Sequence, residues 1–188
     1  MKALKLSIFV LLMANAAFSQ TYAPLDKTPM DMAYYPDNFA HDRKFAPKKV
    51  GKEALARITY SRTAKNDREV FGNLVKFDKV WRIGANEAPE IKFYKDATIN
   101  GKKVPSGTYT LFMTPGKDTW EVILNSDLDV WGAYSYDESK NVLTFKVTQV
   151  ALDTVVENLS ITFDGKNEKE TTFYLAWDKT SVSFPITF

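Results

Sequence analysis

The sequence contains no cysteine and only one histidine, and these two shortages exclude several classes of protein. Without cysteine there can be no disulfide framework, no cysteine nucleophile and no cysteine-ligated zinc or iron–sulfur centre. A zinc enzyme that needs two or three imidazole ligands is also excluded, because His41 is the only imidazole. Glycine-rich phosphate-binding loops are absent as well. We therefore expect no metal site and no cofactor, and we identify no catalytic residue.

Residues 1–19 have the pattern of a signal peptide. Two lysines precede an apolar run at residues 6–13, and Ala17-Phe18-Ser19 supplies a small–any–small cleavage pattern. The run is too short for a membrane-spanning helix, which needs about 20 apolar residues. We predict cleavage near Ser19 and Gln20, export to the periplasm or the cell exterior, and a soluble mature chain without a transmembrane segment.

The small positive charge of the chain comes from this leader. The whole sequence has 25 Lys and Arg against 23 Asp and Glu, and Lys2 and Lys5 fall within residues 1–19, which contain no acid. The mature chain of 169 residues is therefore formally neutral. A neutral balance gives no support for nucleic-acid or membrane binding, so we expect neither as a partner.

The mature chain divides into an arm and a body. Residues 20–53 contain four of the eight prolines and show no sustained period, which indicates an extended N-terminal arm with one helical turn near residues 30–34. Aromatic and methionine side chains within it predict that the arm packs on the body. Residues 54–188 have the features of a single domain.

Alternation with a period of two dominates this domain and predicts β-strands. Leu143, Phe145 and Val147 alternate with polar residues, for example, and Asn100-Gly101 is typical of a two-residue hairpin turn. The pattern predicts nine or ten short strands in an all-β, antiparallel β-sandwich that resembles a jelly roll. We also expect a short helix near residues 150–156, a turn at residues 178–180, and an edge strand around Pro185, because proline cannot donate to a ladder.

Several blocks in the domain resemble domain-of-unknown-function family 2911 (DUF2911), whose members are mostly exported proteins of Bacteroidetes-type bacteria. The most specific is Trp-Arg-Ile-Gly-Ala-Asn-Glu-Ala at residues 81–88. Thr63 and Pro89 depart from the family pattern, which has Pro and Thr there. The resemblance covers residues 54–188, and residues 30–36 more loosely; it implies fold and export but no reaction. The other blocks lie at residues 60–63, 68–72, 104–109 and 131–134.

The same blocks contain our candidate ligand-binding residues. A guanidinium group suits a carboxylate or phosphate, and aromatic rings suit a sugar. One interpretation is therefore a pocket for an anion or a sugar. The other is a buried polar network in which Glu87 pairs with Arg82 and only stabilises a loop. The candidates are Arg62, Arg68, Trp81, Arg82, Asn86, Glu87, Trp131 and Tyr134.

Residues 118–139 form an acidic and aromatic stretch with six acids and no Lys or Arg. Carboxylates beside aromatic rings can hold a sugar, and Asp127 and Asp129 could contact Ca²⁺, although their spacing matches no known calcium loop. The simpler interpretation, which we favour, is a hairpin whose aromatic side chains are in the core and whose acids are solvated.

The leading functional hypothesis is a non-catalytic exported binding module for a glycan, a small anion or another envelope protein. The first alternative is a carboxylate-dependent hydrolase of envelope glycans. The second alternative is a structural subunit of an envelope complex. A serine hydrolase would depend on His41 in the arm, beside Asp42 in sequence, and this arrangement does not favour a catalytic triad.

Overall fold

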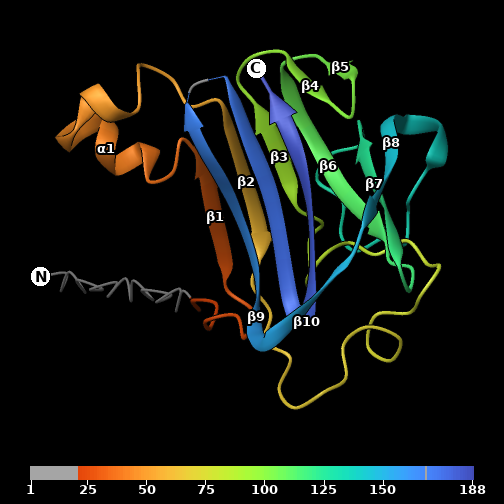
Figure 1. Ribbon diagram of the computed structural model, residues 1–188. Coiled ribbons are helices and arrows are strands. Elements are labelled where there is room, and N and C mark those ends of the chain that lie inside the picture. The colour runs from red at the N-terminus through yellow and green to blue at the C-terminus, as the bar shows by residue number, and fades with distance from the viewer. Residues whose placement is uncertain (1–20, 168) are drawn as a thin grey trace, which may run out of the picture.

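The computed structural model describes residues 21–167 and 169–188 (Figure 1). The predicted signal peptide lies outside the described residues. No helix within them is both long and apolar enough to cross a membrane. The elements are β1 (Met30–Tyr35), α1 (Phe39–Phe45), η1 (Pro47–Lys49), β2 (Ala56–Ser61), β3 (Glu90–Phe93), β4 (Ala97–Ile99), β5 (Lys102–Val104), β6 (Gly107–Thr114), β7 (Thr119–Asn125), η2 (Glu138–Lys140), β8 (Asn141–Thr148), β9 (Val150–Asn167) and β10 (Glu170–Thr187).

Two antiparallel sheets pack face to face, which confirms the predicted all-β sandwich. One sheet has the order β1-β2-β3-β6-β7-β8, and the other has the order β5-β4-β10-β9. Inward side chains from both sheets form one large core, with Ile58 and Leu111 from the first sheet and Leu175 and Val182 from the second. Alternation in sequence places these apolar residues on one face of each strand, so burying that face holds the layers together.

The last two strands are longer than the predicted short strands. β9 and β10 have 18 residues each and pair along most of their length. The helix expected near residues 150–156 is wrong, because β9 begins at Val150. The turn expected at residues 178–180 is also wrong: the register shifts around Asp178, and β10 continues through a bulge.

The edge-strand prediction for Pro185 is wrong as well, because β10 lies inside its sheet. Proline is tolerated there for a local reason. Pairing with β9 ends at Ser181, and pairing with β4 begins at Ile186. Pro185 therefore lies between the two paired segments, where the sheet needs no backbone N–H donor.

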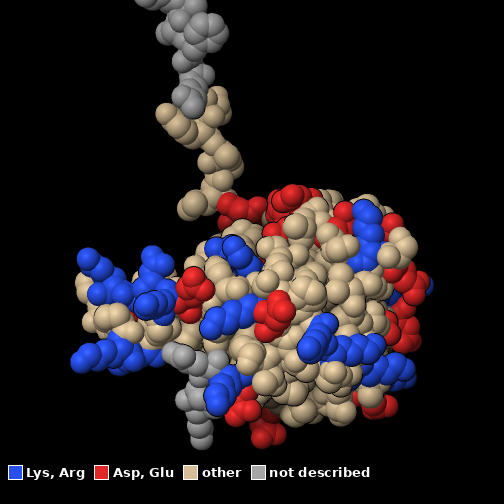
Figure 2. Space-filling view, turned by 90° about the horizontal axis from the view of Figure 1, so that it is seen from above, with Lys and Arg blue, Asp and Glu red and all other residues tan. Residues whose placement is uncertain are grey.

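The N-terminal arm packs on the body, as predicted, but through a strand. β1 pairs with β2 from Met30 to Tyr35, so the helical turn expected near residues 30–34 is wrong, and the helix α1 begins later, at Phe39. α1 and η1 project from the side of the sandwich (Figure 1). Lys and Arg side chains gather on this projection (Figure 2), including Arg43 and Lys44 of α1 and Lys48 of η1.

Two long loops close the sandwich near the candidate residues. The first loop, residues 62–89, connects β2 to β3 below the sheets (Figure 1). The second loop, residues 126–137, covers the outer face of β6 and β7. It does so through a small second core in which Val130 packs with Phe112 and Ile123. The second loop is thus fixed by apolar contacts and can hold surface side chains in place.

Candidate functional site

Trp81 is part of the core. Its backbone forms an antiparallel bridge to Met113 of β6, and its indole is only 7% exposed. The ring stacks on Trp177 at 6.0 Å between centroids, with 10° between the planes, and meets Trp120 edge to face at 6.1 Å. Aromatic pairs in these geometries add to the energy of burial. Trp81 therefore anchors the first loop to both sheets.

A cleft of about 150 Å³ lies at the outer side of this aromatic cluster. It brings together three candidates, Arg68, Trp81 and Arg82, and adds Trp177 of β10. Arg68 donates from Nε to the Lys65 carbonyl oxygen and from Nη2 to the Ala64 carbonyl oxygen, both at 2.6 Å. These bonds fix the Arg68 guanidinium to its own loop. The full lining is Thr63, Arg68, Leu74, Val75, Trp81, Arg82, Gly84, Ala85 and Trp177.

Arg82 is half-buried and has no counter-ion within the described chain. The pairing with Glu87 that we considered from the sequence does not form; among residues 21–167 and 169–188 no ion pair or side-chain hydrogen bond involves the Arg82 guanidinium. Its Nε is buried without a hydrogen-bond partner. Burial lowers the pKa of Arg82, and the nearby Tyr134 phenol partly opposes that shift.

Trp131 and Tyr134 form an exposed aromatic pair beside Arg82. Their rings stack at 5.7 Å with 11° between the planes, although Trp131 is 60% exposed and Tyr134 is 86% exposed. A Cβ at Gly132 would lie 2.7 Å from Tyr134 Cδ2 and 3.9 Å from Arg82 Cδ, so the stack and the arginine are neighbours. We call Trp131 and Tyr134 the aromatic platform.

The platform corrects our favoured interpretation of residues 118–139. We expected the aromatic side chains of this stretch in the core, and Trp120 is there with 1% exposure. The rings of Trp131 and Tyr134 are instead in contact with solvent. The physical reason is that residues 126–137 are a loop, whose backbone does not turn alternate side chains inward.

Two other candidates hold the N-terminal segment and lie outside the cleft lining. Arg62 donates from Nη1 to Asp31 Oδ2 of β1 at 2.8 Å, on the protein surface. Asn86 donates from Nδ2 to Asp26 Oδ2 at 3.1 Å and to Thr28 Oγ1 at 3.2 Å. The Asn86 carbonyl oxygen also accepts a bond of 2.9 Å from the Gly132 N–H, so this residue joins the first loop to the platform.

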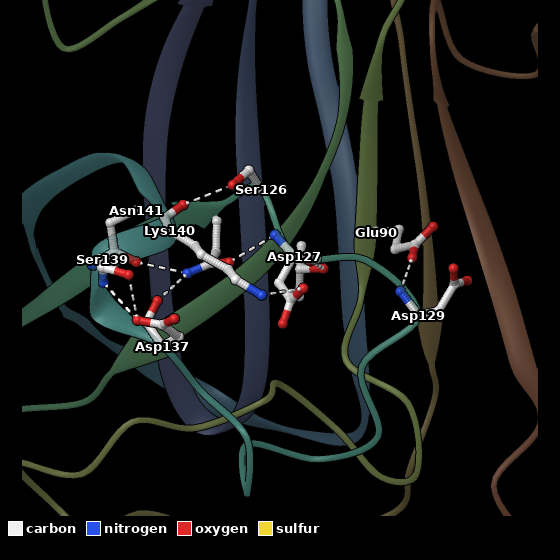
Figure 3. Close-up of polar contacts among 10 residues, drawn as sticks. Glu90, Ser126, Asp127, Asp129, Asp137, Ser139, Lys140 and Asn141 are labelled. Carbon is white, nitrogen blue, oxygen red and sulfur yellow. Dashed lines mark hydrogen bonds and ion pairs between the residues drawn. The ribbon is translucent and has the colours of Figure 1, made fainter.

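The acids of the second loop are held by separate local contacts (Figure 3). Lys140 Nζ binds Asp127 Oδ1 at 2.8 Å, and the Ser139 N–H donates to Asp137 Oδ1 at 2.9 Å. The bonds to Ser139 lower the pKa of Asp137. Asp129 lies apart from these residues. Within the described chain no group of three His, Cys, Asp or Glu side chains has the arrangement of a metal site.

A second cleft of about 220 Å³ includes Asp129 and Val130 of the loop that contains the platform. Glu87, Glu90 and Asp129 line it, together with Met30 of β1. The Asp129 N–H donates to Glu90 Oε1 at 2.9 Å, which fixes one carboxylate of the three (Figure 3). Glu87 is connected to the platform through its backbone, which forms a β-bridge with Trp131.

Sequence reasoning missed two residues that build the site. Trp177 supplies half of the stacked indole pair, but its place in an alternating strand indicated only burial. Gly132, at φ 71°, lets the backbone turn tightly between the two platform residues. That signal was visible, because a glycine between Trp131 and Tyr134 indicates a turn better than a strand.

Comparison with known proteins gives a family and no activity. No curated protein and no solved structure matches the chain. One family model does, over residues 42–186, from within α1 to near the end of β10. That range includes the cleft and the platform. The family is described as a protein of unknown function, and the chain belongs to this family, DUF2911.

Proposed function

We propose that the chain is a non-catalytic, exported binding module that holds a glycan on the aromatic platform. The observation that carries this proposal is the exposed stack of Trp131 and Tyr134. Large aromatic rings are normally buried, since water contact with apolar area costs about 25 cal/mol per Å². A sugar ring has an apolar face of C–H groups that can cover such a ring, while its hydroxyl groups bond to polar neighbours.

The platform is organised before any ligand binds. Trp131 is held by its backbone bridge to Glu87, and Gly132 by the bond from its N–H to Asn86. The loop below is anchored by Val130 in the second core. A ligand that docks here needs little ordering of the protein, so less binding energy is lost to side-chain and loop entropy.

Titration with glycan fragments, followed by calorimetry or by NMR shifts of the tryptophan side chains, tests the proposal. Tyr134→Ala should weaken binding at least tenfold without changing the melting temperature, because this side chain is almost fully exposed. Tyr174→Ala is the matched control, since Tyr174 is an exposed tyrosine on β10 and belongs to neither the cleft nor the platform. Equal loss in both variants, or no loss in Tyr134→Ala, contradicts the platform as the site.

Export is part of the same proposal and rests on the leader pattern of residues 1–19. The mature protein should be recovered from the periplasm or medium with Gln20 as its first residue. Mass spectrometry of the intact secreted chain measures this directly. Recovery only of the full 188-residue chain from the cytosol contradicts it.

A carboxylate-dependent hydrolase is the second candidate, supported by the three carboxylates that line the cleft beside the platform. Hydrolysis of a glycosidic bond needs an acid and a base or nucleophile on the two sides of that bond. If Glu87 acts in this way, the protein should release reducing ends from a glycan, and Glu87→Gln should abolish the release. Glycan binding without any release of reducing ends supports the binding module.

A further inference from the structure

We infer that the glycan is acidic: a carboxylate on the sugar enters the cleft next to the platform and is bound by Arg82 and Arg68. This inference rests on the proposed function, because the platform supplies the sugar contact. The inference adds the chemical class of the glycan, which the two exposed rings alone do not determine.

The charge of the cleft is the first step. Among the residues that line it, two are arginines and none is an aspartate or glutamate. The carboxylates of Glu87, Glu90 and Asp129 line the other cleft instead. Since no neighbouring acid in the lining neutralises them, the two guanidinium groups create a positive site at the end of the sandwich.

The state of Arg82 is the second step. Placing a cation partly out of water without a partner is unfavourable, and a buried N–H without an acceptor adds to that cost. Both conditions hold for Arg82, whose Nε has no acceptor and whose guanidinium has no counter-ion within residues 21–167 and 169–188. A carboxylate beside it would supply the missing charge and also accept two parallel hydrogen bonds from the planar group.

The third step is that the cleft and the platform lie next to each other. Arg82 lines the cleft, and its Cδ lies 3.9 Å from the position a Cβ would take on Gly132, between the two platform residues. Trp81 and Ile83, on either side of Arg82, are buried in the core and fix its backbone. Arg68 is fixed by its bonds to two loop carbonyl groups. A ring on the platform therefore has a cationic site beside it.

The cleft is large enough to admit a charged substituent of a sugar. About 150 Å³ accommodates a carboxylate and the carbon atoms next to it, and the remainder of an oligosaccharide would lie outside, across Tyr134. A uronic or sialic acid has this form, with a carboxylate projecting from a ring that has an apolar face.

The experiment compares acidic oligosaccharides with their methyl esters, which keep the sugar and remove the charge. Short oligomers of galacturonate, glucuronate and sialic acid are each titrated in both forms into the mature protein. We expect one acid to bind at least tenfold more tightly than its ester, with the difference shrinking at high salt. Arg82→Gln should remove that preference. Arg57→Gln is the matched control, a half-buried arginine at the other end of β2.

The outcomes separate this inference from the proposed function. If acid and ester bind equally, and Tyr134→Ala weakens both, the platform binds glycans and the acidic inference is overturned. If neither form of any oligomer binds, the acidic inference is overturned, and the titrations with other glycan fragments decide the proposed function. An acid preference that survives in Arg82→Gln and in Arg68→Gln also overturns the inference.

A measurement without ligand adds an independent check. Arg82→Met removes the unpaired charge and keeps most of the side-chain volume, so its melting temperature should equal or exceed that of the wild type. A fall of more than 5 °C would show that the arginine is a structural partner and would overturn the inference.

Discussion

Replacing Trp81 with alanine tests whether the first loop depends on the aromatic cluster. The indole contacts Trp177 and Trp120, and Phe71 lies 5.7 Å away in an edge-to-face arrangement. Truncation of a buried tryptophan costs about 3–5 kcal/mol. One side of Trp81 lines the cleft, so water can enter the space that alanine leaves, and we expect the lower part of that range, about 3–4 kcal/mol.

Trp120→Ala is the comparison for the predicted loss of stability in Trp81→Ala. It is 1% exposed and does not line the cleft, so the cavity left by Trp120→Ala would stay closed, and its cost should be larger, about 4–5 kcal/mol. For a chain of this length 1 kcal/mol corresponds to roughly 2–4 °C, so Trp81→Ala should melt roughly 6–16 °C below the wild type.

The assay is urea unfolding of the protein followed by far-UV circular dichroism, which does not depend on tryptophan emission. The slope of free energy against urea should remain as in the wild type, while the midpoint falls. A loss below about 1 kcal/mol for Trp81→Ala would refute the reasoning, because it would show that the indole is not packed as the structure has it. A loss greater than that of Trp120→Ala would refute the argument from water entry.

Three further predictions concern backbone and pH. Gly84→Ala should cost roughly 2–5 kcal/mol in a chemical melt, because φ is 107° and a Cβ would lie 2.6 Å from the Ser61 carbonyl oxygen. Gly132→Ala should cost only about 1–2 kcal/mol but should reduce glycan affinity severalfold, since its Cβ would displace the Tyr134 ring. Burial raises the pKa of Tyr60 above its usual 10.0. The contribution of Tyr60 to the free energy of unfolding is therefore complete below pH 10 and is lost as pH rises through the pKa of Tyr60 in the folded state. Above pH 10 the free energy of unfolding should fall less steeply in Tyr60→Phe than in the wild type, by up to about 1.4 kcal/mol per pH unit.

The fold could be predicted wherever one face of a strand is buried. Alternation located β8 and the two halves of β10, although it predicted a turn between those halves. Asn100-Gly101 located β4 and β5 to the residue. Prediction from the sequence failed for strand segments in which neither face is the buried one. Val150 and Val155 are both exposed in β9, so no inward set of residues identified its start. β1 was missed because the prediction depended on local pattern, whereas its pairing with β2 is a long-range contact.

The candidate site was predictable in its residue types but not in its partners. Guanidinium chemistry singled out Arg68 and Arg82, and the structure places both in one cleft. Arg62 was chosen by the same reasoning and instead contacts Asp31, because β1 adds to the sheet beside it. The sequence offered Glu87 as the partner of Arg82 since they are five residues apart, but separation along a loop does not determine which side chains face each other.

The residues around Arg82 explain how one short segment can serve both stability and binding. Trp81 and Ile83 turn into the core, and Arg82 between them lines the cleft. The segment runs beside β6 without joining a regular sheet, and Gly84 then lets it approach Ser61 closely. The core thus fixes the backbone of Arg82, and little backbone entropy remains to be lost when an anion binds. For the same reason, exchanging Arg82 should change ligand preference with little effect on folding, whereas exchanging its neighbours should change folding first.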